Sequence, residues 1–344
     1  MAVKLRKIDE QVMVITGATS GIGLTTARKA AEAGAKLVLA ARNGDALEQL
    51  ASELRRKGSQ VVTVTADVGV PAEVENIGKT AMERFGRIDT WVNNAGVSIF
   101  GRYEDTPLED MQRLFQTNYW GVVHGSLEAV KRMKGGDGGA IINLGSELSE
   151  RSVPLQGMYS ASKHAVKAFT DALRMELEKE EAPISVTLIK PAAIDTMFTV
   201  HARNYMDKEP ALPPPIYAPE VPADAILYAA QHQKREVFVG GAAKAISSGS
   251  FAMPRVMDRF MEKSMFDQQQ SELPSAPGRR DALHQTDPES ALRQRQGMPN
   301  HVLERSAYTA VTLRSHKIAP VVLGIGALFA AWSLSRRPAL RKFF

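Results

Sequence analysis

The chain has 344 residues, 24% of them charged, and a net charge of +5, which predict one large globular domain with a smaller appendage. It contains no cysteine, which excludes disulfides, thiolate nucleophiles and cysteine-held zinc or iron–sulfur sites, and we expect no metal. Basic residues alternate with acidic ones through most of the chain, which argues against a nucleic-acid partner.

The N-terminal stretch MAVKLRKIDEQ holds no apolar core of signal-peptide length, so we expect a cytoplasmic main domain. Short apolar runs then alternate with helical patterns. The runs are 12–16, 36–41, 60–66, 90–95, 140–145, 184–189 and 236–240. They are apolar throughout, as in strands covered on both faces. This alternation predicts an α/β fold, a Rossmann-like, doubly wound, seven-stranded parallel sheet with a C-terminal helical extension.

A glycine-rich turn, TGATSGIG, follows the first apolar run at residues 16–23. Glycines at such a turn let the backbone approach a pyrophosphate at the positive end of the next helix. A tight strand–helix turn alone would also need glycine. No lysine follows, which disfavours a phosphate-binding Walker loop, so the position favours a dinucleotide. The candidate residues are Thr16, Gly17, Ser20, Gly21, Ile22 and Gly23.

The end of the second run reads LAARN, with Arg42 where an NAD-selective fold usually offers a carboxylate to the ribose. Arginine can pair bidentately with a phosphate. A solvated surface arginine is the alternative, but we expect Arg42 to bind the 2′-phosphate, which favours NADP over NAD.

Further along, GMYSASKHAVKAF places Tyr159 four residues before Lys163 in a helical pattern. The two side chains therefore share a helix face. A phenol has a pKa of about 10, and a neighbouring ammonium favours the phenolate. We therefore expect Lys163 to lower the pKa of Tyr159 and so ease proton transfer, although a surface lysine beside a packed ring would look the same.

Six motifs in this order resemble the short-chain dehydrogenase/reductase family over about residues 8–240. They are TGATSGIG (16–23), DV (67–68), NNAG (93–96), Asn118 in QTNYWG, Ser146 in NLGS and YSASK (159–163). The resemblance implies a catalytic tetrad. In it, Tyr159 is the general acid or base, Ser146 orients the substrate oxygen, Lys163 also binds the nicotinamide ribose, and Asn118 helps hold a water.

The resemblance also implies the remaining cofactor contacts. Asp67 matches the residue that contacts the adenine ring, and Thr196 fits the position that binds the nicotinamide carboxamide. In KPAAIDT (190–196), however, Ala192 stands where glycine is usual, and alanine resists positive φ. The expected contacts beyond the glycine turn are Arg42, Asp67, Val68, Asn94, Ala95, Gly96, Tyr159, Lys163, Pro191, Ile194 and Thr196.

A long Pro-rich excursion at residues 197–221 matches the family's substrate lid, and its Met, Phe and Tyr content predicts a bulky apolar substrate. His201 and Arg203 could meet an anionic group, but we interpret them as solvated loop residues. Residues 253–265 repeat methionine every four positions. This pattern predicts a packed helix or, as the sharper alternative, an adaptable lid over an apolar substrate.

After the catalytic domain, residues 1–266, the polar stretch 267–306 has no sustained apolar period and predicts a flexible linker. The tail, residues 307–344, contains the uncharged segment 318–334 followed by basic residues. This segment is at the short limit for a membrane helix. We expect membrane attachment there, with a helix buried in an oligomer as the alternative.

Together these features predict an NADP(H)-dependent oxidoreductase that interconverts a carbonyl and an alcohol on a bulky apolar small molecule. The alternative is a non-catalytic dinucleotide-binding or membrane-scaffold protein that retains the fold; loss of a tetrad residue would have indicated it, and none is lost. The resemblance further implies a homodimer or homotetramer, often formed through the helices that contain Asn118 and Tyr159.

Overall fold

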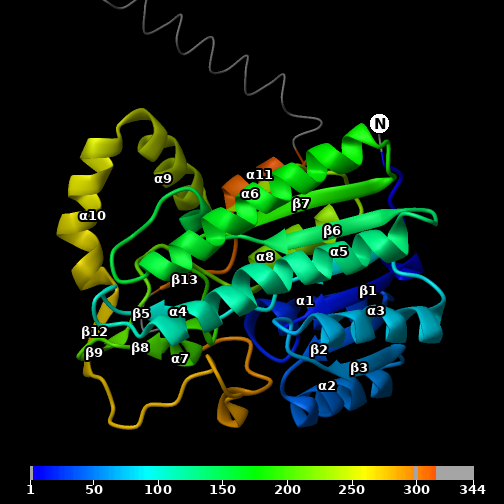
Figure 1. Cartoon of the computed structure of the whole chain (residues 1–344), viewed down its shortest axis with the longest axis horizontal. Helices are drawn as coiled ribbons and strands as arrows, with labels where there is room; N and C mark the ends of the chain where they lie inside the picture. Colours follow the sequence, from blue (N-terminus) through cyan, green and yellow to red (C-terminus); the bar gives the residue numbers. More distant parts are fainter. Residues whose placement is uncertain (1–2, 298–300, 315–344) are drawn as a thin grey trace, which may run out of the picture.

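The computed structural model describes residues 3–297 and 301–314. Its centre is a seven-stranded sheet in the order β3-β2-β1-β4-β6-β7-β11, and every pair of neighbouring strands is parallel (Figure 1). The predicted fold class is therefore confirmed. The strands are β1 (Val12–Thr16), β2 (Lys36–Ala41), β3 (Val61–Thr65), β4 (Thr90–Asn93), β6 (Gly139–Leu144), β7 (Ile184–Pro191) and β11 (Glu236–Val239).

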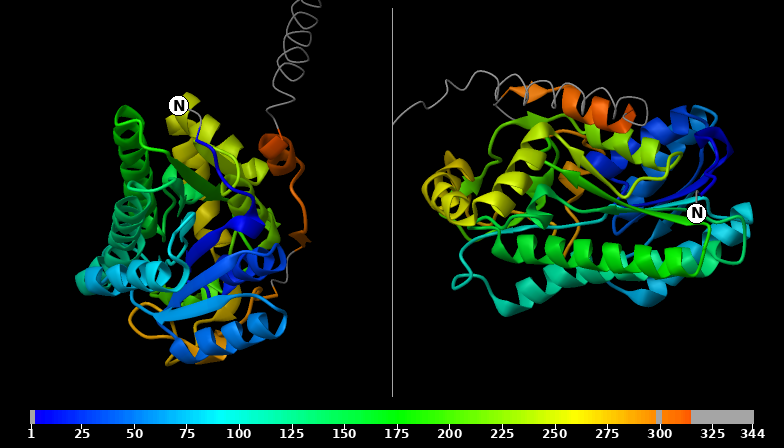
Figure 2. Two further views of the ribbon diagram at one scale, coloured as in Figure 1. Left: turned by 90° about the vertical axis from the view of Figure 1, so that its right-hand side faces the viewer. Right: turned by 90° about the horizontal axis from the view of Figure 1, so that it is seen from above.

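Helices cover both faces of the sheet (Figure 2). One face packs against α1 (Gly21–Glu32), α2 (Gly44–Arg56) and α8 (Glu220–Ala229). The opposite face packs against α3 (Pro71–Phe85), α5 (Gly121–Met133) and α6 (Gly157–Lys179). The result is the three-layer arrangement that a parallel sheet needs in order to keep both faces out of water.

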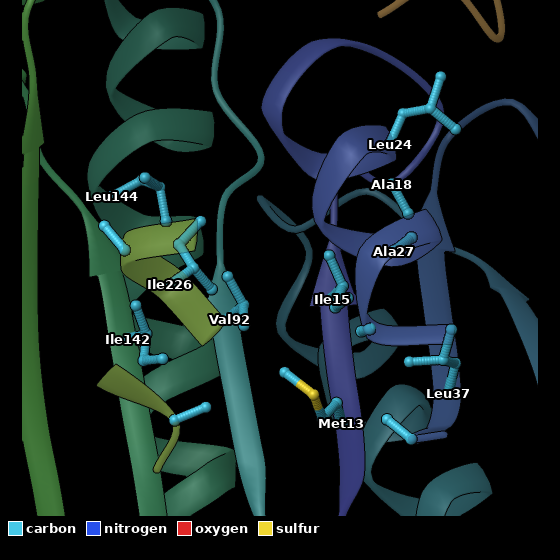
Figure 3. Packing of buried hydrophobic residues seen from close by; sticks show 14 of the residues in the cluster. Met13, Ile15, Ala18, Leu24, Ala27, Leu37, Val92, Ile142, Leu144 and Ile226 are labelled. Carbon is cyan, nitrogen blue, oxygen red and sulfur yellow. The ribbon is translucent and has the colours of Figure 1, made fainter. Parts of the chain in front are cut away.

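Strand β1 shows why the central runs are apolar at every position. Met13 and Ile15 join the core beneath α1 and α8, whereas Val12 and Val14 join the core beneath the other layer. Successive side chains in a strand point to opposite faces, so both sets must be apolar. Figure 3 shows Met13 and Ile15 packed beside Val92 of β4 and Leu37 of β2.

Smaller elements surround the ends of the sheet. Two-residue and longer ladders join distant parts of the chain: β5 (Ile99–Phe100) pairs with β8 (Arg203–Asn204), β9 (Lys208–Pro210) with β12 (Gln270–Pro274), and β10 (Ile216–Tyr217) with β13 (Val302–Leu303). The helices α9 (Gly241–Ala252) and α10 (Pro254–Gln268) stand beside the sheet (Figure 1). The remaining helical elements are η1 (Ile8–Glu10), α4 (Leu108–Phe115), η2 (Gln116–Trp120), η3 (Glu147–Ser149), α7 (Phe198–His201), η4 (Pro288–Ser290) and α11 (Ala307–Arg314).

Part of the segment 267–306, expected to be a flexible linker, is held against the domain by buried side chains and main-chain hydrogen bonds. We call residues 276–297 the strap. Its Leu283 is fully buried, the N–H of Leu292 donates to Thr19 O over 2.8 Å, and the N–H of Gly21 donates to Arg293 O over 3.0 Å. Composition missed this because the strap is held by main-chain hydrogen bonds, which require no apolar period.

The helix α11, at the start of the expected tail, packs on the main domain. Leu313 joins the core beneath α8, and the N–H of Gly240 donates to Thr309 Oγ1 over 3.0 Å. The expected membrane segment 318–334 lies outside the described residues. Within 3–297 and 301–314, no helix has both the length and the apolar character to cross a membrane.

Candidate active site

The carboxyl ends of β1, β2, β4, β6 and β7 open onto one cavity of about 420 Å³. This is the edge of a doubly wound sheet at which ligands bind. Of the residues expected from the sequence, all but Thr16, Gly23 and Asn118 line this cavity. The strap contributes Ala282, Thr286, Asp287 and Ala291 to the same wall. Nowhere in the described part of the chain are three His, Asp or Glu side chains grouped as metal ligands.

In the turn between β1 and α1, the three glycine positions do not tolerate a larger residue. Gly17 and Gly21 have φ of 66° and 52°, in the left-handed region that favours glycine. A Cβ on Gly23 would lie 2.2 Å from Gly17 O. Asn94 holds the turn by donating from Nδ2 to Thr16 O over 2.9 Å. A cavity against bare backbone at the start of a helix fits the pyrophosphate of a dinucleotide.

The predicted catalytic residues converge from three elements. Ser146 follows β6, and its Oγ accepts the N–H of Leu148 over 3.1 Å. Tyr159 and Lys163 lie one turn apart in α6, with Lys163 Nζ 5.5 Å from the centre of the Tyr159 ring. Lys163 Nζ donates to Leu144 O over 2.8 Å, which fixes the ammonium beside the end of β6.

Burial governs the pKa values of this pair. It raises the pKa of Tyr159, and the hydrogen bond with Ser146 only partly opposes that rise, while the charge of Glu147 adds to it. Burial also lowers the pKa of Lys163 to about 8. The expected lowering of the Tyr159 pKa by Lys163 is therefore not met in this structure, because desolvation of the phenolate dominates.

Asn118 lies in η2, a π-helical turn between α4 and α5, and is fully buried. Its Oδ1 accepts the N–H of Val97 over 2.8 Å, and its Nδ2 donates to Val97 O over 2.9 Å. The side-chain amide of Asn118 thus binds the backbone of Val97, in the segment that follows β4. Asn118 stands behind the cavity wall. A Cβ on Gly96 would lie 3.4 Å from Asn118 Oδ1 and 3.9 Å from Lys163 Nζ, so both side chains lie beside this glycine.

Ala192 shows no strain at the position where glycine is usual. Leu155, Glu181 and Leu292 have positive φ, and Ala192 does not belong to that group. Its N–H donates to Val239 O over 2.9 Å, which continues the pairing of β7 with β11. The backbone of this segment therefore accommodates alanine, and Pro191, Ile194 and Thr196 line the cavity.

Arg42 also lines the cavity, but the strap engages it. Its guanidinium donates to the carbonyls of Leu283, over 3.1 Å, and of Ala282. Arg113 donates to Leu283 O over 3.1 Å and pairs with Asp67. Burial and then repulsion from Arg113 lower the pKa of Arg42. The end of the cavity beyond β2 thus concentrates positive charge beneath the strap.

The opposite end of the cavity is apolar. Phe198 packs edge-on against Tyr159 with ring centres 5.3 Å apart, and Leu212, Met261 and Met265 complete the wall. Met261 and Met265 are buried, whereas Met253 is 54% exposed. The second half of α10 therefore lines the cavity, as the lid interpretation of the methionine pattern expects. At the start of the pattern, Met253 stays largely exposed.

His201 is not the solvated loop residue we expected, whereas the Arg203 side chain is 43% exposed and also forms an ion pair. His201 Nε2 lies 2.5 Å from Ser290 Oγ, and burial lowers its pKa. Arg203 Nη1 donates to Asp281 Oδ2 over 2.8 Å. The interpretation of His201 was wrong because its partner, Ser290, belongs to the strap, whose position the sequence did not indicate.

Glu147 is the cavity residue that the motifs missed. It follows Ser146, lines the cavity and is half-buried, and burial raises its pKa to about 7. A lone glutamate in a short turn carries no periodic or spacing signal. The clue in the sequence was its position beside Ser146, one residue into the loop that leaves a strand.

Known proteins resemble the chain in sequence and in fold. The profile of the family described as short chain dehydrogenase matches residues 11–207. The uncharacterized oxidoreductase YxnA of Bacillus subtilis (strain 168) is 48% identical over 336 residues, 97% of this chain and 93% of that protein. An alcohol dehydrogenase from the archaeon Thermococcus sibiricus, complexed with 5-hydroxy-NADP, matches 66% of this chain and 95% of its own with 29% identity and a TM-score of 0.59. A short chain dehydrogenase/reductase from Burkholderia phymatum, in complex with NAD, matches 79% of this chain and all of its own with 27% identity and a TM-score of 0.64.

Proposed function

The chain belongs to the short-chain dehydrogenase/reductase family of oxidoreductases, and on that premise we propose that it uses NADP(H) to interconvert a carbonyl and an alcohol on a bulky apolar substrate. The observation that carries the proposal is the meeting of two features in one cavity. Tyr159, Ser146 and Lys163 face the same space as the bare backbone of Gly17 and Gly21.

A nicotinamide dinucleotide, when bound, would supply the hydride for reduction and accept it for oxidation. The residues of this chain handle the proton and the charge. In reduction, Tyr159 gives its phenolic proton to the carbonyl oxygen, and in oxidation it takes the proton back. Ser146 donates a hydrogen bond to the same oxygen, which stabilises the charge that develops there.

The raised pKa of Tyr159 fits a group that holds its proton until the substrate arrives. Lys163, whose pKa is lowered to about 8, lies close enough to stabilise the phenolate after the proton has left. Asn118 fixes the backbone at Val97, against which this part of the site is built. These roles follow the family pattern and stay part of the proposal.

Arg42 supports NADP over NAD. It lies at the end of β2, where a dinucleotide presents its adenine ribose, and no carboxylate occupies that strand end. The guanidinium of Arg42 could donate to a 2′-phosphate in place of the strap carbonyls to which it now donates. Of the two similar solved structures, one is complexed with 5-hydroxy-NADP and the other with NAD, so the preference for NADP rests on Arg42.

The apolar end of the cavity supports a bulky, largely hydrocarbon substrate. The wall at that end is formed by apolar side chains from four separate segments. They are Phe198, Leu212, Ile246, Met261 and Met265. Methionine side chains can repack around ligands of different shapes. The substrate therefore carries its reacting carbonyl at one end of an apolar body.

We further propose a homodimer or homotetramer formed through η2, α5 and α6. Trp120, Leu127 and Met175 on these helices are 46%, 51% and 59% exposed. Large apolar side chains gathered on neighbouring helices favour burial against a second copy. Size-exclusion chromatography with light scattering would show a monomer if this is wrong.

The test of the proposed function is NADPH oxidation, followed at 340 nm, by the full chain with a panel of long-chain ketones and aldehydes. Turnover of at least one panel member is expected. The alternative, a non-catalytic dinucleotide-binding protein, would bind NADPH yet turn over no member in either direction.

A further inference from the structure

A carboxyl group stands next to the predicted carbonyl-binding residue without a partner. Glu147 is the first residue of η3, directly after Ser146, and both residues line the cavity. Among residues 3–297 and 301–314, none forms a hydrogen bond or an ion pair with the Glu147 carboxyl group. Burying a carboxylate without compensation is costly, so this position calls for an explanation.

Four lysines on the elements that contact η3 have other partners. The turn η3 packs against α6, α9 and β7, which carry Lys163, Lys167, Lys244 and Lys190. Lys163 donates to Leu144 O, and Lys167 and Lys190 both pair with Glu150. Lys244 lies over the Phe238 ring, 4.7 Å from its centre. None of these four lysines forms an ion pair with Glu147.

The surroundings of Glu147 inside the cavity are apolar. Leu148 and Val153 belong to the same buried cluster as Tyr159, Met261 and Met265. This setting accounts for the raised pKa of Glu147, and the side chain is still reached from the cavity because it is only half-buried. A carboxylate in such a wall can accept a strong hydrogen bond from a ligand, because little water competes for it.

We infer that Glu147 is a specificity-determining residue that accepts a hydrogen bond from a hydroxyl group of the substrate, close to the reacting carbonyl. The inference rests on the proposed function. Consecutive Cα atoms are about 3.8 Å apart, so a group held by Glu147 lies within a few bonds of an oxygen held by Ser146. A substituted ammonium fits less well, because it would lose its hydration among apolar side chains.

The substrate class is thus a hydroxyketone with an apolar tail, and the product is the corresponding diol. A bound NADPH would supply the hydride to the carbonyl carbon and become NADP⁺, and Tyr159 would give its proton to the carbonyl oxygen and become a phenolate, which regains a proton from solvent. The neighbouring hydroxyl keeps its proton and leaves unchanged. Glu147 therefore selects the substrate and takes no part in bond making.

The experiment compares two probes that differ in one donor, 1-hydroxydecan-2-one and 1-methoxydecan-2-one, with the full chain and NADPH. For the native protein, kcat/KM should be about 10- to 100-fold higher for the hydroxyketone, mainly through KM, as expected for a hydrogen bond to a charged group. In Glu147→Leu the ratio should fall to about one. Glu147→Gln, which keeps an acceptor, should give an intermediate ratio.

Glu109→Gln is the matched control, because Glu109 is exposed and the change removes the same charge. It should keep the native ratio. A native ratio of about one, or a high ratio that survives in Glu147→Leu, would overturn the inference while leaving the proposed function intact.

If neither probe is reduced, fluorescence titration of the NADPH complex with the same pair decides the inference separately. Tighter binding of the hydroxyketone that Glu147→Leu abolishes would support the subsite. Equal binding of the two probes by the native protein would overturn it.

Discussion

Two regions of the molecule build the cavity by different means. Residues 11–207 form most of the sheet and present Ser146, Tyr159 and Lys163 from a core held by apolar burial. The strap contributes little apolar core, and hydrogen bonds join its backbone to Thr19, Gly21 and Arg42. The first region carries the proposed reacting groups, and the strap closes the end of the cavity at which we propose that the cofactor binds. The strap is therefore attached through the same residues that a dinucleotide would contact.

The largest expected effect concerns the first region alone. Tyr159→Phe removes the proton donor but keeps the ring that packs on Phe198. We expect kcat to fall by about 100-fold or more, the range for loss of a general acid, and NADPH binding to stay within about twofold. Steady-state assays and NADPH fluorescence give the two values. Retained turnover would show that another group moves the proton.

The second region can be broken at its buried anchor. Leu283→Ala should weaken the attachment of the strap by about 2 kcal/mol or more, because a fully buried leucine side chain is cut back. Local opening of the strap should then expose Arg279, whose side chain is 13% exposed in the folded protein. We expect trypsin to cut there at least about tenfold faster than in the native protein.

Leu273→Ala is the control for that experiment, since Leu273 is 66% exposed in β12. It should leave the cleavage rate unchanged. Equal cleavage of the native protein and Leu283→Ala would mean that the strap is not held by this contact.

A smaller effect should appear in the pH dependence of stability. The pKa of Glu147 is raised from 4.5 to about 7 in the folded state, so the folded protein binds this proton more tightly than the unfolded chain. Stability should therefore fall as the pH rises from about 4.5 to 7. Glu147→Gln cannot lose a proton and should be more stable than the native protein at pH 8, by about 3 kcal/mol, and equal to it near pH 4. Thermal unfolding at both pH values measures this, and a constant difference would contradict the assignment.

Removal of the tail is expected to have the smallest effect on turnover. The prediction that 318–334 attaches the protein to membranes stays a prediction. Because α11 ends at Arg314, a chain truncated after that residue keeps the packed helix. The full chain should float with phosphatidylglycerol-containing vesicles, the truncated chain should not, and their turnover should agree. Equal flotation of the two would refute the prediction.

The sheet could be predicted from the sequence because its signals are local. Each predicted run overlaps a strand, and the runs 12–16 and 36–41 match β1 and β2 end to end. The residues expected at the site lie where parallel strand ends converge, so motif order was enough to gather them. Arg42 was placed correctly at the cavity, but its present partners could not be foreseen.

The rest depends on contacts between segments far apart in the chain. Leu283 is a single apolar residue in a polar stretch, and its burial comes from the fold around it. The interpretation of His201 as solvated failed for the same reason, since Ser290 lies 89 residues away. The pKa of Tyr159 rises because the ring is buried, which its spacing from Lys163 does not reveal.

The most direct test of the account is the affinity of the full chain for NADPH and NADH, measured by fluorescence titration of the native protein and of Arg42→Asp. The account predicts that the native protein binds NADPH at least about tenfold more tightly than NADH, through a charge-assisted contact with Arg42. It predicts that Arg42→Asp loses this preference. Equal affinities in the native protein, or a preference that survives the substitution, would contradict the assignment of Arg42 to the 2′-phosphate.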